Sequence, residues 1–190
     1  MDAFSLARPG VPAAHAGRAW GDAPSNILED GMAEHEQFET FAGTLAGDVH
    51  FELADECLPY QPVRTLWETE GEVAPLGRTR AAGQHCADDR GGGSNGRIVF
   101  TAADGDELRA IYTFTLLSES PELLTMTLTG RFVDGGTGRF VHASGALTAL
   151  VHAHTTVVPP TLETVWPVDF AFEGQVRYRT ASETPPGGSE

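Results

Sequence analysis

The most constraining feature of this sequence is an alternation of apolar and polar residues, with a period of two, that recurs between residues 36 and 179. Successive side chains of a strand point to opposite faces, so the alternation predicts strands with one buried face. No long helical periodicity interrupts the series. About nine segments qualify as strands: 36–43, 47–54, 64–71, 77–86, 96–103, 107–117, 123–133, 145–155 and 167–179. Short strands at this spacing favour an antiparallel barrel or sandwich.

The sorting of faces favours a closed barrel. In segment 168–178 one face is apolar and aromatic, carrying Val168, Phe170, Phe172, Val176 and Tyr178. The segments 108–116 and 124–132 repeat this pattern, and Asp104-Gly105 is a strong hairpin signal between two strands. We therefore predict an all-β, roughly eight-stranded antiparallel closed barrel, which leaves room for packed side chains or one small ligand.

The glycine-rich stretch 131–145, RFVDGGTGRFVHASG, does not fit a phosphate-binding loop. Such loops place their glycines between a strand and a helix, whereas here a strand follows and the chain contains no lysine. We interpret Gly135, Gly136 and Gly138 as a sharp corner between strands that needs positive φ or close backbone approach. The flanking Phe132 and Phe140 would pin this corner to the core.

Length and charge limit the domain organisation and the partners. A chain of 190 residues suits one domain. We predict a flexible acidic arm or short helix over 1–35, the barrel over 36–180 and a disordered tail over 181–190. The net charge of −15 disfavours binding to nucleic acid and to anionic membranes.

Cysteine content and the N-terminal sequence bear on location. Cys57 and Cys86 are too few for a disulfide framework in a chain of this size. We find no apolar signal-peptide region near the N-terminus and no run long enough to span a membrane as a helix. These features predict a cytoplasmic protein with both cysteines reduced.

The stretch FVDGGTGRFVHASGALTA resembles the strand–corner–strand signature of the dirigent and allene oxide cyclase barrels, as bacterial members carry it. The hairpin GRIVFTAADGDELRAIYTF, the strand DFAFEGQVRY and the Leu76-Gly77-Arg78 step also resemble this family, over about residues 36–180. The resemblance implies an eight-stranded barrel with a hydrophobic cavity. It also implies cofactor-independent closure or coupling of reactive small molecules, including intramolecular cycloadditions in polyketide pathways, but it supplies no catalytic motif by position.

Two histidines, His152 and His154, share one side of a predicted strand at a spacing that can chelate a metal. The opposite side of that strand carries apolar residues, and no second ligand motif follows. We expect both imidazoles to face outward or into an interface, and no metal to be bound.

Tyr112 and Tyr178 lie on apolar faces of predicted core strands and are the candidate catalytic residues. Either hydroxyl would orient or polarise a substrate carbonyl, or it would only pair with the backbone inside the core. The candidate substrate-binding residues are the large apolar side chains on the same faces: Trp67, Phe100, Met126, Trp166, Phe170 and Phe172. Glu68, Glu70 and Glu72 share a face and are expected in solvent.

Together these features predict a cofactor-independent cyclase or isomerase that shapes a small, largely apolar, polyketide- or terpenoid-like substrate inside the barrel. The alternatives are a non-catalytic carrier of a small hydrophobic ligand and a structural barrel with a filled interior. We expect a homo-oligomer, either a dimer or a trimer, and neither a nucleic-acid nor a membrane partner.

Overall fold

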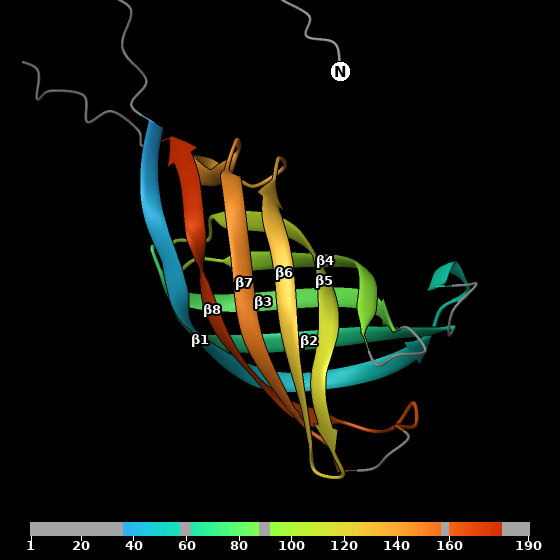
Figure 1. Cartoon of the computed structure of the whole chain (residues 1–190). Helices are drawn as coiled ribbons and strands as arrows, with labels where there is room; N and C mark the ends of the chain where they lie inside the picture. The colour runs from blue at the N-terminus through green and yellow to red at the C-terminus, as the bar shows by residue number, and fades with distance from the viewer. Residues whose placement is uncertain (1–35, 58–61, 88–91, 157–159, 180–190) are drawn as a thin grey trace, which may run out of the picture. The chain divides into compact units, whose positions relative to one another are not determined.

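The computed structural model describes residues 36–57, 62–87, 92–156 and 160–179, and it confirms the predicted eight-stranded antiparallel closed barrel. The elements, in chain order, are β1 (Glu36–Leu53), η1 (Asp55–Cys57), β2 (Val63–Ala74), β3 (Gly77–Ala87), β4 (Gly93–Thr101), β5 (Glu107–Ser120), β6 (Leu123–Val133), η2 (Gly138–Phe140), β7 (Ser144–His154) and β8 (Trp166–Arg179). Each strand pairs with its sequence neighbours, and β8 pairs with β1 to close the barrel (Figure 1).

The first two predicted strands form the single long strand β1. Gly43 and Gly47 lie within this strand where β2 comes close: a Cβ at either position would overlap the carbonyl oxygen of Glu72 or Glu68. The glycines interrupt the apolar pattern in the sequence but not the strand, because close approach of two backbones is what a glycine inside a strand permits.

The predicted faces of the strands are correct. In β8, the side chains at 168, 170, 172, 176 and 178 are buried, whereas Asp169, Glu173 and Gln175 are exposed. The barrel core contains a cluster of phenylalanine rings around Phe41, which makes edge-on contacts with Phe100 at 5.1 Å, Phe132 at 5.0 Å and Phe172 at 5.9 Å between ring centroids. Edge-to-face packing of this kind fills the interior with side chains.

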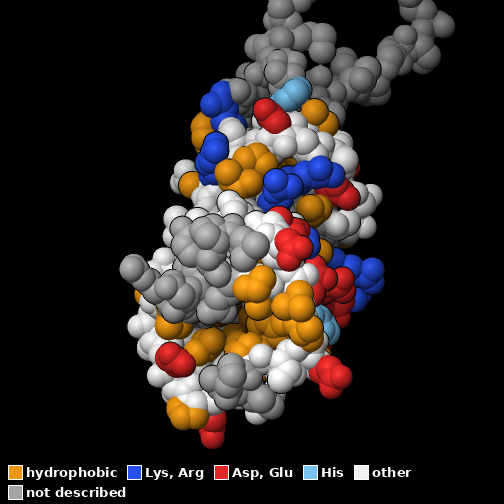
Figure 2. Space-filling model, turned by 90° about the vertical axis from the view of Figure 1, so that its right-hand side faces the viewer, with side chains coloured by type: hydrophobic (Ala, Val, Ile, Leu, Met, Phe, Trp, Pro, Cys, Tyr) orange, Lys and Arg blue, Asp and Glu red, His pale blue; other side chains and the backbone are white. Residues whose placement is uncertain are grey.

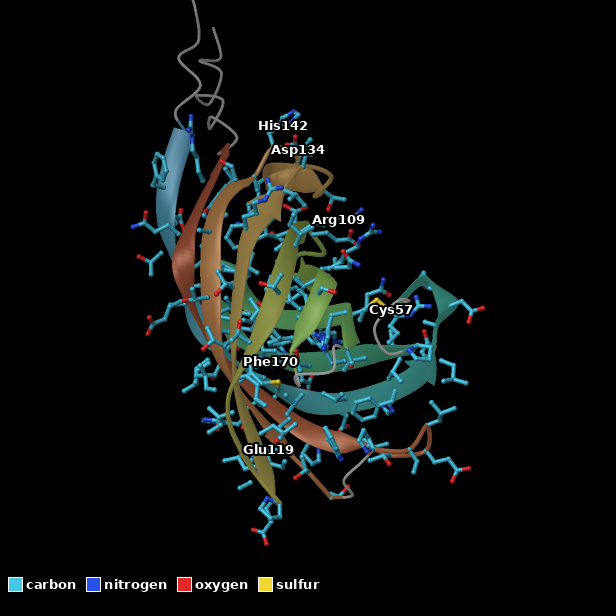
Figure 3. The ribbon with its side chains drawn as sticks, turned by 45° about the vertical axis from the view of Figure 1, so that its right-hand side comes forward. Cys57, Arg109, Glu119, Asp134, His142 and Phe170 are labelled. Carbon is cyan, nitrogen blue, oxygen red and sulfur yellow. A yellow bond between two sulfur atoms is a disulfide. The ribbon has the colours of Figure 1, made fainter. Side chains whose placement is uncertain are left out.

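The two ends of the barrel differ. The corner end carries the turns 75–76 and 102–106 and the segment 134–143, and the β5–β6 end carries the β5–β6 hairpin and the other three connections. Figure 3 shows Asp134 and His142 at the corner end, Glu119 at the β5–β6 end, and Phe170 between them. The side chain of Phe140 in η2 is fully buried and closes the corner end from within.

The glycine corner is structural, and its geometry refines our prediction. Gly135 and Gly138 have positive φ, at 100° and 51°, but Gly136 does not. Gly136 is required for space instead, because a Cβ there would overlap the carbonyl oxygens of Phe140 and Glu107. The corner is fastened to the β4–β5 turn by paired hydrogen bonds: Thr137 N donates to Glu107 O at 2.9 Å, and Glu107 N donates to Thr137 Oγ1 at 2.8 Å.

The prediction of two reduced cysteines is wrong. Cys57 in η1 and Cys86 at the end of β3 form a disulfide, with both side chains buried. Their 29-residue separation hid this pairing, because a pair of cysteines in a sequence does not show whether the fold brings them within bonding distance. Figure 3 shows Cys57 beside the β3 end of the barrel.

Some predictions fall on residues outside those the structure describes. The arm or helix over 1–35 and the tail over 181–190 belong to this group. Within the described part of the chain, no helix has the length and hydropathy needed to cross a membrane.

Candidate functional site

A buried polar cluster forms where β2, β3 and β5 approach the β5–β6 end of the barrel. The hydroxyl of Tyr112 accepts a hydrogen bond from Trp67 Nε1 at 2.9 Å and donates one to Gln84 O at 3.0 Å. His85 Nδ1 lies 3.2 Å from the same oxygen. A phenol has one hydrogen, which here goes to Gln84 O, so Nδ1 of His85 is the donor in the third bond.

Glycines make room for each aromatic member of this cluster. A Cβ at Gly83 would overlap the indole of Trp67, one at Gly93 would overlap the imidazole of His85, and one at Gly96 would overlap the ring of Tyr112. Side-chain packing over bare glycine backbone is a known way to stabilise a strand that lacks a side chain. The three polar aromatic side chains therefore occupy positions that the backbone leaves vacant for them.

The β4 backbone bulges beside the cluster. The register between β3 and β4 shifts between Gln84 and Cys86, and the register between β4 and β5 shifts between Gly93 and Gly96. Asn95, inside this irregular stretch, has a φ of 55°. Bulges are frequent at barrel rims and beside functional sites, where they re-aim side chains, and here the bulge lies next to His85 and Tyr112.

Burial controls the protonation of Tyr112. Its side chain is 4% exposed, and desolvation raises its pKa well above the usual value, against the smaller lowering effect of the Trp67 hydrogen bond. The hydroxyl is thus neutral at physiological pH. It serves the cluster as a hydrogen-bond donor and acceptor and not as a base.

An apolar rim lies at the β5–β6 end, and we define it as Phe51, Leu124, Met126 and Trp166. Four strands contribute to this end of the barrel. Val49 of β1 pairs with Trp166 of β8, and Leu124 of β6 pairs with Ala153 of β7. Phe51, Leu124 and Met126 are half-buried and pack on the core, and the Phe51 ring meets the Trp166 indole edge-on at 4.9 Å.

More hydrophobic side chains extend beyond the rim into solvent. Leu53 at the end of β1 is 65% exposed, and Leu162 and Val165, just before β8, are 53% and 40% exposed. Figure 2 views the side of the molecule that contains this end and shows hydrophobic side chains gathered on it. Large apolar side chains grouped in this way are typical of binding surfaces.

The predicted substrate-binding residues divide into two groups. Phe100, Phe170 and Phe172 are fully buried in the packed core, and Trp67 belongs to the polar cluster, where its ring lies on Phe170 at 4.6 Å. Only Met126 and Trp166 reach the rim.

The two candidate catalytic tyrosines lie in different surroundings. The Tyr178 ring packs on Phe140 of the glycine corner at 5.0 Å, and none of the aromatic contacts of the described residues joins it to Tyr112. Burial and the nearby Glu39 carboxylate raise the pKa of Tyr178 to about 12, although the Arg139 guanidinium acts in the opposite direction. Tyr178 is thus part of the packing that closes the corner end.

His152 and His154 face outward, as predicted. His154 Nε2 lies 3.2 Å and His152 Nδ1 4.0 Å from the same Asp169 oxygen on β8. Among the described residues, no group of three or more His, Cys, Asp and Glu side chains could hold a metal ion. Glu68, Glu70 and Glu72 are exposed on the outer face of β2, which also agrees with expectation.

His85 is the member of the cluster that sequence reasoning missed. The alternation Thr79, Ala81, Gly83, His85 places this histidine on the inner face of β3, so its interior position was readable from the sequence. The glycine-rich stretch 91–96 was a second signal, since glycines in a strand often mark a bulge or a close approach. The hydrogen bond to Tyr112, 27 residues away, depends on the register of the bulge and was not readable.

No family model, curated protein or solved structure matches this chain.

Proposed function

We propose that the protein binds a small, largely apolar molecule at the β5–β6 end of its barrel. The apolar rim is the observation that carries this proposal, because three large apolar side chains that pack on the core are only half-buried there, whereas the phenylalanines further inside the barrel are buried. Small-molecule sites are mostly apolar with a few placed polar groups, and mouths of barrels are common places for them.

The test is binding of the neutral fluorophore N-phenyl-1-naphthylamine to the full chain, followed by its fluorescence. Met126→Gln and Leu124→Gln place an amide in the rim and should weaken binding at least tenfold. Leu150→Gln is the matched control, since Leu150 is 44% exposed on the outer face of β7, away from the rim. Circular dichroism should show that all three variants are folded. Equal affinities of the three for the fluorophore would then contradict the location of the site.

A second candidate function is a cofactor-independent cyclase or isomerase, and the polar cluster supports it. A rim that holds one reactive conformer beside this cluster would accelerate closure by orientation, which in the best intramolecular models contributes about 7–11 kcal/mol. This is the activity implied by the resemblance to dirigent and allene oxide cyclase barrels, and the shared fold does not by itself carry it.

Turnover separates enzyme from carrier. The probe is 1,7,9-decatrien-3-one, a neutral linear trienone that closes by intramolecular cycloaddition with no oxidant or cofactor. An enzyme should accelerate closure and bias the product stereoisomers, and His85→Ala should remove both effects. A carrier should bind the trienone and leave its rate and product ratio at the values measured in buffer.

Location and assembly form part of the proposal. The expected cytoplasmic location implies reduced cysteines, whereas disulfides persist mainly in oxidising compartments. We propose that the protein works where the Cys57–Cys86 bond can form. Assembly into a dimer or trimer also remains a proposal, which light scattering of the full chain would test.

A further inference from the structure

Trp166 carries a buried indole N–H group that has no hydrogen-bond partner in the described part of the chain. Its side chain is 6% exposed, and no acceptor among the described residues lies within hydrogen-bond reach of Nε1. A buried donor left unpaired is destabilising by about 1–3 kcal/mol, so native structures rarely keep one without a functional reason. The Trp67 indole offers a direct comparison, because its Nε1 is paired with Tyr112.

The unpaired donor belongs to the apolar rim. Trp166 begins β8 on the same inner face as Val168 and Phe170, and its ring packs edge-on against half-buried Phe51. A molecule seated on Phe51 therefore lies beside Trp166, the one rim side chain that has a hydrogen to donate.

The charges at this end select a neutral acceptor over a carboxylate. Arg64, near the start of β2, is already engaged: its Nε lies 2.8 Å from Glu52, and its NH2 nitrogen lies 2.6 Å from Glu56. The chain as a whole carries a charge of −15, which repels anions. Burying a carboxylate against a neutral indole would leave its charge without a counter-ion.

We infer that the ligand of the rim is an uncharged, largely apolar molecule with a carbonyl or similar neutral oxygen, and that this oxygen accepts a hydrogen bond from Trp166 Nε1. The inference rests on the proposed binding function and adds to it the chemical class of the ligand and the residue that selects it. Trp166 is a specificity-determining residue on this view, because it distinguishes an oxygenated ligand from a hydrocarbon of the same shape.

Three naphthalenes of matched shape test the inference: 2-acetylnaphthalene has a neutral carbonyl, 2-ethylnaphthalene lacks the oxygen, and 2-naphthoate carries a charge. Calorimetric titration of the full chain should give the ketone about five- to tenfold higher affinity than the hydrocarbon, the usual effect of one hydrogen bond. The carboxylate should bind more weakly than the ketone. In Trp166→Phe, which keeps an aromatic ring against Phe51, ketone and hydrocarbon should bind equally.

A nuclear magnetic resonance readout checks the contact directly. The chain has three tryptophans, so the ¹⁵N-labelled protein has three indole N–H signals, and the one lost in Trp166→Phe identifies Trp166. The ketone should shift this signal downfield, and the hydrocarbon should not. If ketone and hydrocarbon bind equally to the wild type, or if the ketone preference survives in Trp166→Phe, the inference is overturned and the binding function stands. If none of the three binds, both are overturned.

Discussion

The hydroxyl of Tyr112 accepts a hydrogen bond from Trp67 Nε1 at 2.9 Å, across a distance of 45 residues in the chain. This contact joins β2 to β5 through the barrel interior, although the two strands are not neighbours in the sheet. Hydrogen bonds between buried side chains fix one arrangement of a core that apolar contacts alone would hold less specifically.

Removal of the Tyr112 hydroxyl should therefore reduce stability without abolishing the fold. Tyr112→Phe keeps the ring but leaves Trp67 Nε1, His85 Nδ1 and Gln84 O without their shared partner. We expect a loss of about 1–3 kcal/mol in the free energy of unfolding, measured by urea denaturation. Phe114→Leu is the control, because it removes a neighbouring ring but no hydrogen bond. In nuclear magnetic resonance spectra, Tyr112→Phe should shift the indole N–H signal of Trp67 upfield, and Phe114→Leu should not.

The strands and their faces were predictable because local alternation records which side of a strand is buried. Segment 167–179 shows this, since every predicted inward residue from Val168 to Tyr178 is buried. The site was predicted only in part, because it depends on where distant strands meet. The bulge at 93–96 places His85 against Tyr112, and the η1 turn places Cys57 against Cys86. Neither contact can be read from the residues next to it in the sequence. Alternation also cannot tell which end of the barrel a residue occupies, so Tyr112 and Tyr178 were grouped as one candidate pair.

Gly136→Val should destabilise the barrel through steric overlap and not through strained φ. A side chain at this position meets the carbonyl oxygens of Phe140 and Glu107, both backbone atoms of the corner and its anchor. We expect a loss of about 1–3 kcal/mol or more, seen as a lower melting temperature. Gly77→Ala is the control: φ there is 72° with open space around it, so only the backbone preference of about 1 kcal/mol is lost. Equal melting temperatures for Gly136→Val and the wild type would contradict this account of the corner.

Alkaline pH should destabilise the protein through Tyr178. Its pKa is raised from 10.0 to about 12 in the folded state, so folding disfavours its ionisation. The stabilising contribution is complete below pH 10, the pKa of an unfolded tyrosine, and is lost as the pH rises from about 10 through 12. Absorbance at 295 nm should show a tyrosine that titrates near pH 12 in the wild type and is missing in Tyr178→Phe. A midpoint near 10 for this difference would show that Tyr178 is not buried at the corner end.

The Cys57–Cys86 disulfide should contribute substantially to stability. It closes a loop of 29 residues that includes β2 and most of β3, and closing a loop of this length lowers the entropy of the unfolded chain by an amount worth about 3–4 kcal/mol. We expect Cys57→Ser and Cys86→Ser to lose similar amounts of unfolding free energy. Dithiothreitol should lower the wild-type melting temperature but not that of either variant.

Two chemical measurements check the disulfide itself. Intact mass under non-reducing conditions should be 2 Da below the reduced value, and a thiol assay of the unfolded chain should find no free cysteine. Because His85 precedes Cys86 and contacts Tyr112, reduction should also change the indole signal of Trp67. A wild type with two titratable thiols, or with the same melting temperature in dithiothreitol, would remove the disulfide from the account of both stability and location.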